Sequence, residues 1–294
     1  MIRTFLAIST LIAAAPAAMA QTAPTPVVAA PMVQLPHVSV TAIGAGPPVI
    51  LIPGLATPRA VWDGIAPALA KTHRVYLVQV NGFGGDDPRA NLSDGVLDGI
   101  VGDLNDFIVT QKLERPAVIG HSLGGLAGML LAARHPDAVG RLMVVDALPF
   151  IGAIIAPGRT AAEIGPQAAT MRDAIAATHG TPRPPVTTDP GGIWSNHPAG
   201  RIRVANWSNA ADQRVVARAM YDDMTTDATP DLTSIRARPF TVLYATGAGP
   251  IATTIWGKAY AGSPATLEPV ADSYHFIMLD QPAAFAAAVD RFLK

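Results

Sequence analysis

Cysteine is absent from the sequence of 294 residues, so no disulfide can form, and neither a cysteine nucleophile nor a thiolate metal site is available. Charge is also scarce: only 15% of the residues are charged, and 21 basic residues face 22 acidic ones. Because nucleic-acid binding and basic membrane-binding faces both need clustered Lys or Arg, neither is expected. Ligand spacing typical of a hydrolytic metal is missing too, and we expect no cofactor. Half of the residues are apolar, which is enough for a sizeable core.

The first 20 residues have the pattern of an export signal. Arg3 gives a positive start, residues 5–15 are mostly apolar, and Ala18-Met19-Ala20 is a small-residue cleavage site. The apolar stretch is short for a spanning helix, so we expect removal before Gln21 and no stable membrane insertion afterwards; an uncleaved anchor is the alternative. The Ala- and Pro-rich style suggests a bacterial protein, exported to the periplasm or the medium.

Residues 21–36 are rich in proline and alanine and are predicted to form an extended linker, because proline blocks helix and central strand. From residue 37, apolar runs typical of strands alternate with segments that have apolar residues every three or four positions. This alternation predicts an α/β domain over residues 37–294, with a mainly parallel sheet flanked by helices. The expected strands are 37–43 (at a sheet edge), 49–52, 75–80, 117–119, 142–145, 240–244 and 265–270, and the expected helices are 60–71, 92–111, 123–134, 255–260 and 283–293.

The alternation is interrupted after the strand that ends at Asp146. Residues 147–231 are richer in proline, glycine and short helical pieces, and then the strand–helix pattern resumes. Such an insertion predicts a helical lid over the strand ends. Its apolar residues are candidates for an acyl or alcohol pocket, namely Ile151, Ile154, Ile155, Trp194, Trp207 and Met220.

The segment Gly120-His121-Ser122-Leu123-Gly124 matches G-x-S-x-G, with an apolar strand before it and a small-residue helix after it. In this context the glycines permit a tight strand-to-helix turn that exposes the serine hydroxyl, and the helix N-terminus favours developing negative charge. Ser122 is therefore the candidate nucleophile.

Four stretches together resemble the α/β-hydrolase superfamily, and the resemblance covers nearly all of residues 38–294. They are VILIPGLATPRAVW, NGFGG, VIGHSLGG and YHFIMLDQPAAF. The resemblance implies a catalytic triad, in which a serine hydroxyl needs an adjacent base. The Gly-rich NGFGG lacks the lysine of a phosphate-binding loop and is interpreted as structural.

The resemblance implies that His275, after the last strand and before the final helix, is the general base. His121, beside the nucleophile in sequence, is poorly placed for that role and is expected to shape the pocket. The acid is less certain, because residues 245–250, where most relatives carry it, contain no carboxylate. Asp146, one strand earlier, is the preferred candidate, Asp272 is an alternative, and the absence of an effective acid is a third possibility. The remaining histidines are interpreted as ordinary structural or surface residues.

The oxyanion hole needs two backbone N–H donors. The first is the amide of Leu123, directly after the nucleophile. The second is expected from Leu55, because Pro53-Gly54-Leu55 resembles the His-Gly-x loop of the family and Gly54 allows close approach of the backbone.

Serine at position 122 narrows the reaction. Superfamily members that open epoxides or remove halide attack with aspartate, so acyl transfer to water remains. We expect a serine hydrolase that acts on a small-molecule carboxylic ester or lactone. The alternatives are carbon–carbon bond or amide hydrolysis on the same fold, and a weakly catalytic ligand-binding protein, which the missing carboxylate after residue 244 favours.

Overall fold

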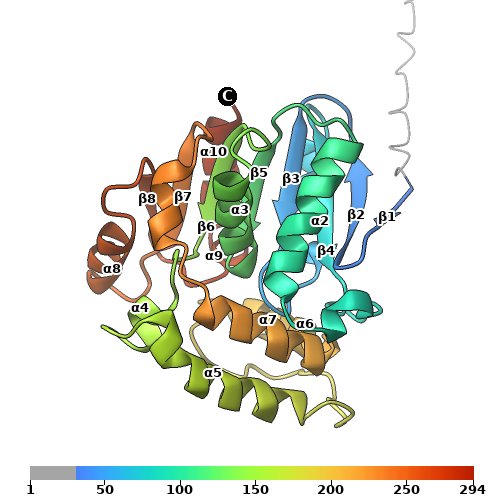
Figure 1. Cartoon of the computed structure of the whole chain (residues 1–294), viewed down its shortest axis with the longest axis vertical. Coiled ribbons are helices and arrows are strands. Elements are labelled where there is room, and N and C mark those ends of the chain that lie inside the picture. Colours follow the sequence, from blue (N-terminus) through green and yellow to red (C-terminus); the bar gives the residue numbers. More distant parts are fainter. Residues whose placement is uncertain (1–30) are drawn as a thin grey trace, which may run out of the picture.

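The structure, a computed structural model, describes residues 31–294. The predicted signal peptide and residues 21–30 of the predicted linker lie outside the described residues. Eight strands form one sheet in the order β1-β2-β4-β3-β5-β6-β7-β8 (Figure 1). Strands β1 and β2 pair antiparallel and β2 joins β4 antiparallel, whereas all other pairs are parallel. The strands are β1 (Val33–Gln34), β2 (Val38–Ile43), β3 (Pro48–Ile52), β4 (Arg74–Val80), β5 (Ala117–His121), β6 (Arg141–Val145), β7 (Phe240–Ala245) and β8 (Thr266–Val270).

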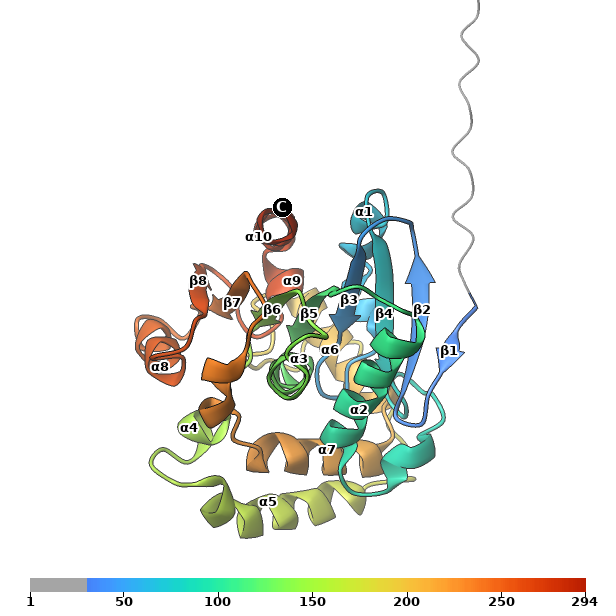
Figure 2. The same ribbon diagram turned by 45° about the horizontal axis from the view of Figure 1, so that its top comes forward.

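The central strands are apolar on both faces because helices cover both sides of the sheet. In β3, Ile50 and Ile52 join one buried core and Val49 and Leu51 join the other. The first core is closed by α2 (Val96–Thr110), α3 (Leu123–Arg134) and α8 (Ile251–Ala259), and the second by α1 (Ala66–Leu69), α9 (Ile277–Asp280) and α10 (Pro282–Leu293). Figure 2 shows α1 and α10 on the opposite side of the sheet from α2 and α3. This is the predicted mainly parallel, helix-flanked α/β architecture.

The chain between β6 and β7 forms a helical insertion, which continues a few residues past the predicted end at residue 231. It contains α4 (Gly152–Ile155), α5 (Ala161–Ala176), α6 (Pro198–Ala210), α7 (Gln213–Thr225) and the 3-10 helix η3 (Thr229–Ser234). Figure 1 shows α5 and α7 stacked below the sheet, beyond the ends of the strands. The predicted helical character of this segment is thus observed, while its role as a lid stays a prediction.

Three predicted element boundaries are wrong. Residues 37–43 are not an edge strand, because Val33 and Gln34, inside the predicted linker, pair outside β2. The predicted helix 60–71 is split into the 3-10 helix η1 (Arg59–Trp62) and α1, because Pro67 lacks the N–H that a continuous helix would use. The predicted helix 92–111 begins only at Val96, after Gly95 at φ 83°, and a separate 3-10 helix, η2 (Arg89–Leu92), precedes it.

Helix α8 and the final strand lie close to their predicted positions, although α8 begins at Ile251 rather than residue 255. Among the helices of residues 31–294, none has the length and apolar character that a bilayer span requires.

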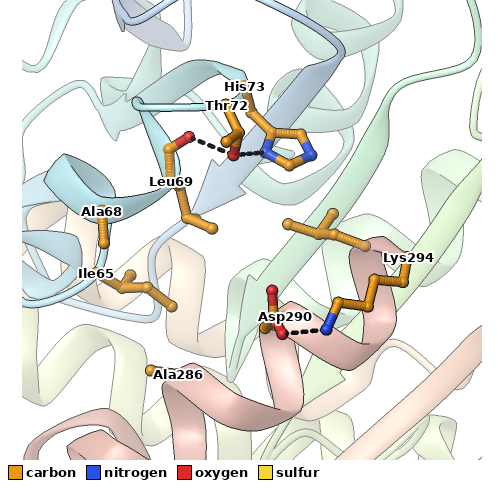
Figure 3. Close-up of a pocket in the computed structure, with 9 residues that line it drawn as sticks. Ile65, Ala68, Leu69, Thr72, His73, Ala286, Asp290 and Lys294 are labelled. Atoms are coloured by element: carbon orange, nitrogen blue, oxygen red, sulfur yellow. Dashed lines mark hydrogen bonds and ion pairs between the residues drawn. The ribbon is translucent and has the colours of Figure 1, made fainter.

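A groove of about 300 Å³ lies between α1 and α10, away from the strand ends (Figure 3). At its rim Asp290 pairs with Lys294 at 2.7 Å, and the Thr72 hydroxyl lies 2.9 Å from Nδ1 of His73. Its lining contains none of the predicted catalytic residues. The predicted catalytic residues follow β5 and β6 or precede α9, and they lie outside this groove.

Candidate active site

Ser122 occupies the sharp turn between β5 and α3. Its backbone lies at φ 53° and ψ −125°, a conformation that a non-glycine residue adopts only when the surroundings hold it there. The surroundings are close-packed: a Cβ on Gly120 would collide with the carbonyl oxygen of Gly124, and a Cβ on Gly124 would collide with those of Ile52 and Pro53. The Ser122 N–H also donates to the Val145 carbonyl at 3.0 Å. The strained turn is thus fixed to both neighbouring strands.

Replacement of Gly120 by alanine is expected to destabilise the fold by about 3 kcal/mol or more, because the added methyl group meets rigid backbone rather than a movable side chain. Urea unfolding of the purified variant and of wild type measures this loss of stability. Gly102→Ala is the matched control: Gly102 lies inside α2 with open space around its Cβ position, so alanine should stabilise by about 0.5–1 kcal/mol. An unchanged urea midpoint for Gly120→Ala would contradict this description of the turn.

The structure brings Asp146 and His275 together. Nδ1 of His275 lies 2.8 Å from Oδ2 of Asp146, and both side chains are largely buried. The second oxygen, Oδ1, accepts the Ala245 N–H at 2.8 Å. Because a carboxylate only accepts, Nδ1 of His275 carries the proton and Nε2 keeps its lone pair, which is the tautomer that a general base needs.

Asp146 reaches His275 from a strained position of its own. Its backbone lies at φ 47°, immediately after β6, and its N–H donates to the Leu243 carbonyl at 2.8 Å. The carboxylate therefore lies beside the end of β7, and the Ala245 amide meets it there. Asp272 is exposed, and within residues 31–294 its carboxylate has no hydrogen bond or ion pair. Of the two candidate acids, only Asp146 contacts His275.

His121 packs directly against the candidate base. The two imidazole rings are 4.6 Å apart, and Nε2 of His121 donates to the His275 carbonyl oxygen at 2.9 Å. Burial, with a smaller contribution from the charge of His275, holds the pKa of His121 well below its usual range, so it stays neutral. It supports the backbone of His275, consistent with the predicted shaping role.

In the described part of the chain, no hydrogen bond joins the Ser122 hydroxyl to His275. The backbone segments that carry Ser122 and His275 are nevertheless connected. His121, directly before Ser122, donates a hydrogen bond to the His275 carbonyl oxygen and packs against its ring. Catalytic hydrogen bonds are often long in a ligand-free site and shorten when substrate binds. The arrangement is therefore compatible with proton transfer from Ser122 to His275 in a complex.

The two predicted oxyanion donors lie on the segments that flank Ser122. Leu123 is the first residue of α3, and Leu55 follows Gly54 in the loop after β3. A Cβ on Gly54 would lie 3.0 Å from Cβ of Ser122, so only glycine lets this loop approach the nucleophile so closely. Within residues 31–294 neither the Leu55 N–H nor the Leu123 N–H has a hydrogen-bond acceptor. Both amides are thus available to a developing oxyanion.

Known proteins with a similar sequence or structure have the same fold as this chain. A family described as "alpha/beta hydrolase fold" matches residues 47–184. The enol-lactonase from Burkholderia xenovorans superposes with a TM-score of 0.66 over 90% of this chain and 99% of its own, at 21% sequence identity. The chain has the α/β-hydrolase fold.

Two curated relatives of this α/β hydrolase match a shorter segment. The pimeloyl-[acyl-carrier protein] methyl ester esterase of Aeromonas hydrophila is 38% identical over 112 residues, 38% of this chain and 42% of that protein. A fluoroacetate dehalogenase of Burkholderia sp. is 30% identical over 109 residues, 36% of each chain. The matching segment thus spans about two fifths of the length of these relatives.

The insertion of this α/β hydrolase contributes an aromatic wall to the site. The Trp194 ring lies 5.6 Å from the His275 ring, edge to face, and the side chain is 53% exposed. The Phe276 N–H donates to the Trp194 carbonyl at 2.9 Å, and Trp207 packs 6.2 Å from the Phe276 ring. These two tryptophans are the predicted pocket residues that the structure places near the base.

The other predicted pocket residues lie elsewhere. Ile151 and Met220 pack into a small core within the insertion, together with Phe150 and Ile164. Ile154 and Ile155 are exposed, at 44% and 48%. An apolar residue in a helical insertion serves either its own core or a pocket, and periodicity does not distinguish these uses.

Asp280 connects the insertion to the histidine loop, the segment around His275 between β8 and α9. This buried carboxylate accepts hydrogen bonds from the Ser195 hydroxyl at 2.5 Å, the Asn196 N–H at 3.1 Å and the Tyr274 N–H at 2.8 Å. Asp280 belongs to the stretch YHFIMLDQPAAF, but the sequence alone predicts no role for it. Because Ser195 and Asn196 lie 85 and 84 positions earlier in the chain, sequence spacing carried no signal for these two partners.

Asp223, on α7, is a second residue that sequence reasoning missed. Burial raises the pKa of Asp223 to about 6, while the nearby charge of His275 lowers it and that of Asp222 raises it. The side chain is half-buried and has no hydrogen bond or ion pair in the described part of the chain. The signal available in the sequence was an acidic pair, Asp222-Asp223, on an otherwise amphipathic helix. Among residues 31–294, no group of three or more His, Asp or Glu side chains is arranged to hold a metal ion.

Asp223→Asn is expected to stabilise the folded protein at pH 8 by about 1–2 kcal/mol and to leave its stability unchanged at pH 4. An aspartate in the unfolded chain titrates near about 3.9, so the folded state with its pKa of about 6 binds more protons between these values. Wild-type stability should therefore fall as pH rises from about 4 to about 6. Urea midpoints at both pH values measure the difference; equal differences at both would show that Asp223 does not titrate abnormally.

Proposed function

We propose that this α/β hydrolase is a serine hydrolase that cleaves a carboxylic ester or a lactone through an acyl-enzyme on Ser122. The observation that carries the proposal is the 2.8 Å contact between His275 and Asp146, beside a serine in the strained turn after β5. This contact fixes the tautomer in which His275 accepts a proton. A protein that only bound ligand would have no need of that arrangement.

The proposed reaction has two acyl-transfer steps. Ser122 Oγ attacks the carbonyl carbon while Nε2 of His275 takes its proton, and Asp146 stabilises the imidazolium that results. The N–H groups of Leu55 and Leu123 donate to the oxyanion of the tetrahedral intermediate. Collapse of this intermediate breaks the bond to the leaving alcohol, which His275 protonates. Water, activated by His275, then attacks the acyl-enzyme and releases the carboxylic acid and the free serine.

Two further observations favour an ester or a lactone as substrate. The similar proteins include a methyl ester esterase and an enol-lactonase, although the first matches over less than half its length and the second shows the fold alone. Serine at position 122 favours acyl transfer over halide removal, because halide removal in the superfamily uses aspartate as the nucleophile. The aromatic wall at Trp194 is suited to an apolar part of a small-molecule substrate.

The test combines turnover with active-site labelling. Purified protein is assayed with p-nitrophenyl esters of increasing chain length and with a panel of γ-lactones, and is treated in parallel with a fluorophosphonate that reacts with activated serines. We expect ester or lactone hydrolysis and a single adduct, mapped to Ser122 by peptide mass spectrometry. If neither turnover nor labelling is observed, the proposal is wrong; labelling without turnover would retain the serine hydrolase and reject the substrate class.

We also propose that the protein is exported and cleaved before Gln21, on the basis of the charged start, apolar stretch and small-residue site of residues 1–20. Mass spectrometry of the protein recovered from the periplasm or medium of a bacterial host should give a mature N-terminus at Gln21. Recovery of only the uncleaved chain from the membrane fraction would support an anchor instead.

A further inference from the structure

Helix α7 lies beyond the carboxyl ends of the strands and extends from the chain after β4 to the chain after β6. Before the helix, the Asp212 N–H donates to the Gly82 carbonyl after β4 at 2.7 Å. After the helix, the Ala228 N–H donates to the Pro149 carbonyl after β6 at 2.9 Å. Because β3 and β5 lie between β4 and β6, the segment from Asp212 to Ala228 extends across the part of the sheet edge where these two strands end.

The dimensions agree with this crossing. A helix of 13 residues is about 20 Å long. The three strand spacings from β4 to β6 amount to about 14 Å. The helix is therefore long enough to span this distance at a tilt, and its inner face packs into the main core with Val215, Val216 and Ala219.

Asp223 projects from that inner face. Val216 and Ala219, seven and four residues before it, share its side of the helix and are buried in the main core. Its neighbour Asp222 points elsewhere, because its carboxylate accepts the Leu97 N–H at the start of α2 at 3.0 Å. The charge of His275 is close enough to act on Asp223.

Asp146 and Asp223 are both within electrostatic range of His275, but only Asp146 contacts it, and the two carboxylates differ in their partners. Asp146 is fully engaged, by His275 and by the Ala245 amide. Asp223 has no hydrogen-bond or ion-pair partner within residues 31–294. A carboxylate that is partly removed from water without a partner is destabilising unless a ligand group pairs with it.

We propose that Asp223 selects the charge of the substrate: it favours esters that carry a cationic group and disfavours esters that carry a carboxylate. The inference rests on the proposed ester hydrolysis and adds a substrate class to it. A cationic group in the acyl or alcohol part would gain the partner that Asp223 lacks, whereas an anionic group would meet a like charge in a poorly solvated site.

The test uses substrates that differ in charge and little in shape. For the acyl part, they are the p-nitrophenyl esters of 4-(trimethylammonio)butanoate (cationic), 5,5-dimethylhexanoate (neutral) and glutarate (anionic). For the alcohol part, they are acetylthiocholine and its neutral isostere S-(3,3-dimethylbutyl) thioacetate. kcat/KM is measured for wild type, Asp223→Asn and the matched control Asp222→Asn, which removes the same charge one residue away.

In at least one series, we expect the cationic-to-neutral ratio of kcat/KM to be about tenfold lower in Asp223→Asn than in wild type, and to be unchanged in Asp222→Asn. The anionic-to-neutral ratio should rise in Asp223→Asn. Each ratio cancels the fraction of folded enzyme, so a purely structural role of Asp223 would not change it.

Other outcomes separate the two proposals. If the neutral esters are hydrolysed but all ratios are the same in wild type and Asp223→Asn, charge selection by Asp223 is wrong and the ester hydrolase stands. If wild type hydrolyses none of the neutral substrates and Ser122 does not react with a fluorophosphonate, the proposed function is wrong and the inference that rests on it is overturned as well.

Discussion

Ser122→Ala is expected to lower kcat for ester hydrolysis by at least about 10⁴-fold, to the level of background. The reason is chemical, because in the proposed reaction the Ser122 hydroxyl forms the acyl-enzyme, and alanine offers no atom to acylate. The fold should persist. The backbone at position 122 is held at φ 53°, and alanine is no larger than serine, so the substitution adds no steric conflict there. Hydrolysis of the best p-nitrophenyl ester, together with circular dichroism and a urea midpoint, measures both effects.

Ser234→Ala provides the control for this substitution. Ser234 is exposed, and its hydroxyl donates only to the Asp231 carbonyl at 2.8 Å within η3. Its kcat should equal that of wild type. Turnover by Ser122→Ala above about one hundredth of wild type would show that another group is the nucleophile, or that His275 activates water directly.

The parallel sheet could be predicted because its strands are buried on both faces. Residues 49–52 form a continuous apolar run, and β3 indeed contributes alternate residues to the two cores. Short helices and strands could not be placed from the sequence, because the apolar pattern and the helix-breaking residues of one segment indicate different structures. In residues 60–71 the apolar stripe indicated one helix, but Pro67 interrupts the hydrogen bonding. The two-residue strand β1 depends on pairing with β2 and has no local pattern of its own.

The residues of the site could be predicted where a local motif or a family pattern carries them. Ser122 is found from its turn, and His275 and Asp146 from their positions after β8 and β6; the structure places the last two in contact. Asp223 and Asp280 could not be found in this way. Asp280 bonds to Ser195 and Asn196 of the insertion, and Asp223 lies on α7 of the insertion. Only the tertiary packing of the insertion relates these groups to residues 274–276.

Asp146→Asn should lower kcat by about 10³- to 10⁴-fold with little effect on folding. Asparagine is among the residues that tolerate the backbone conformation at φ 47°, and its oxygen can still accept the Ala245 N–H. Its amide nitrogen would then face Nδ1 of His275 as a donor. That contact favours the tautomer with the proton on Nε2, which cannot accept the proton of Ser122.

Asp272→Asn is the matched control, because Asp272 also lies at a positive φ, 50°, and is the other acid near His275 in sequence. Its carboxylate is exposed and does not contact the ring, so kcat should stay within about twofold of wild type. The pair of variants therefore discriminates between the two acids. A large loss in Asp272→Asn with little loss in Asp146→Asn would reverse the assignment, and small losses in both would mean that His275 functions without an acid. Because Asp146 alone both contacts Nδ1 and bridges to β7, we expect the loss to be confined to Asp146→Asn.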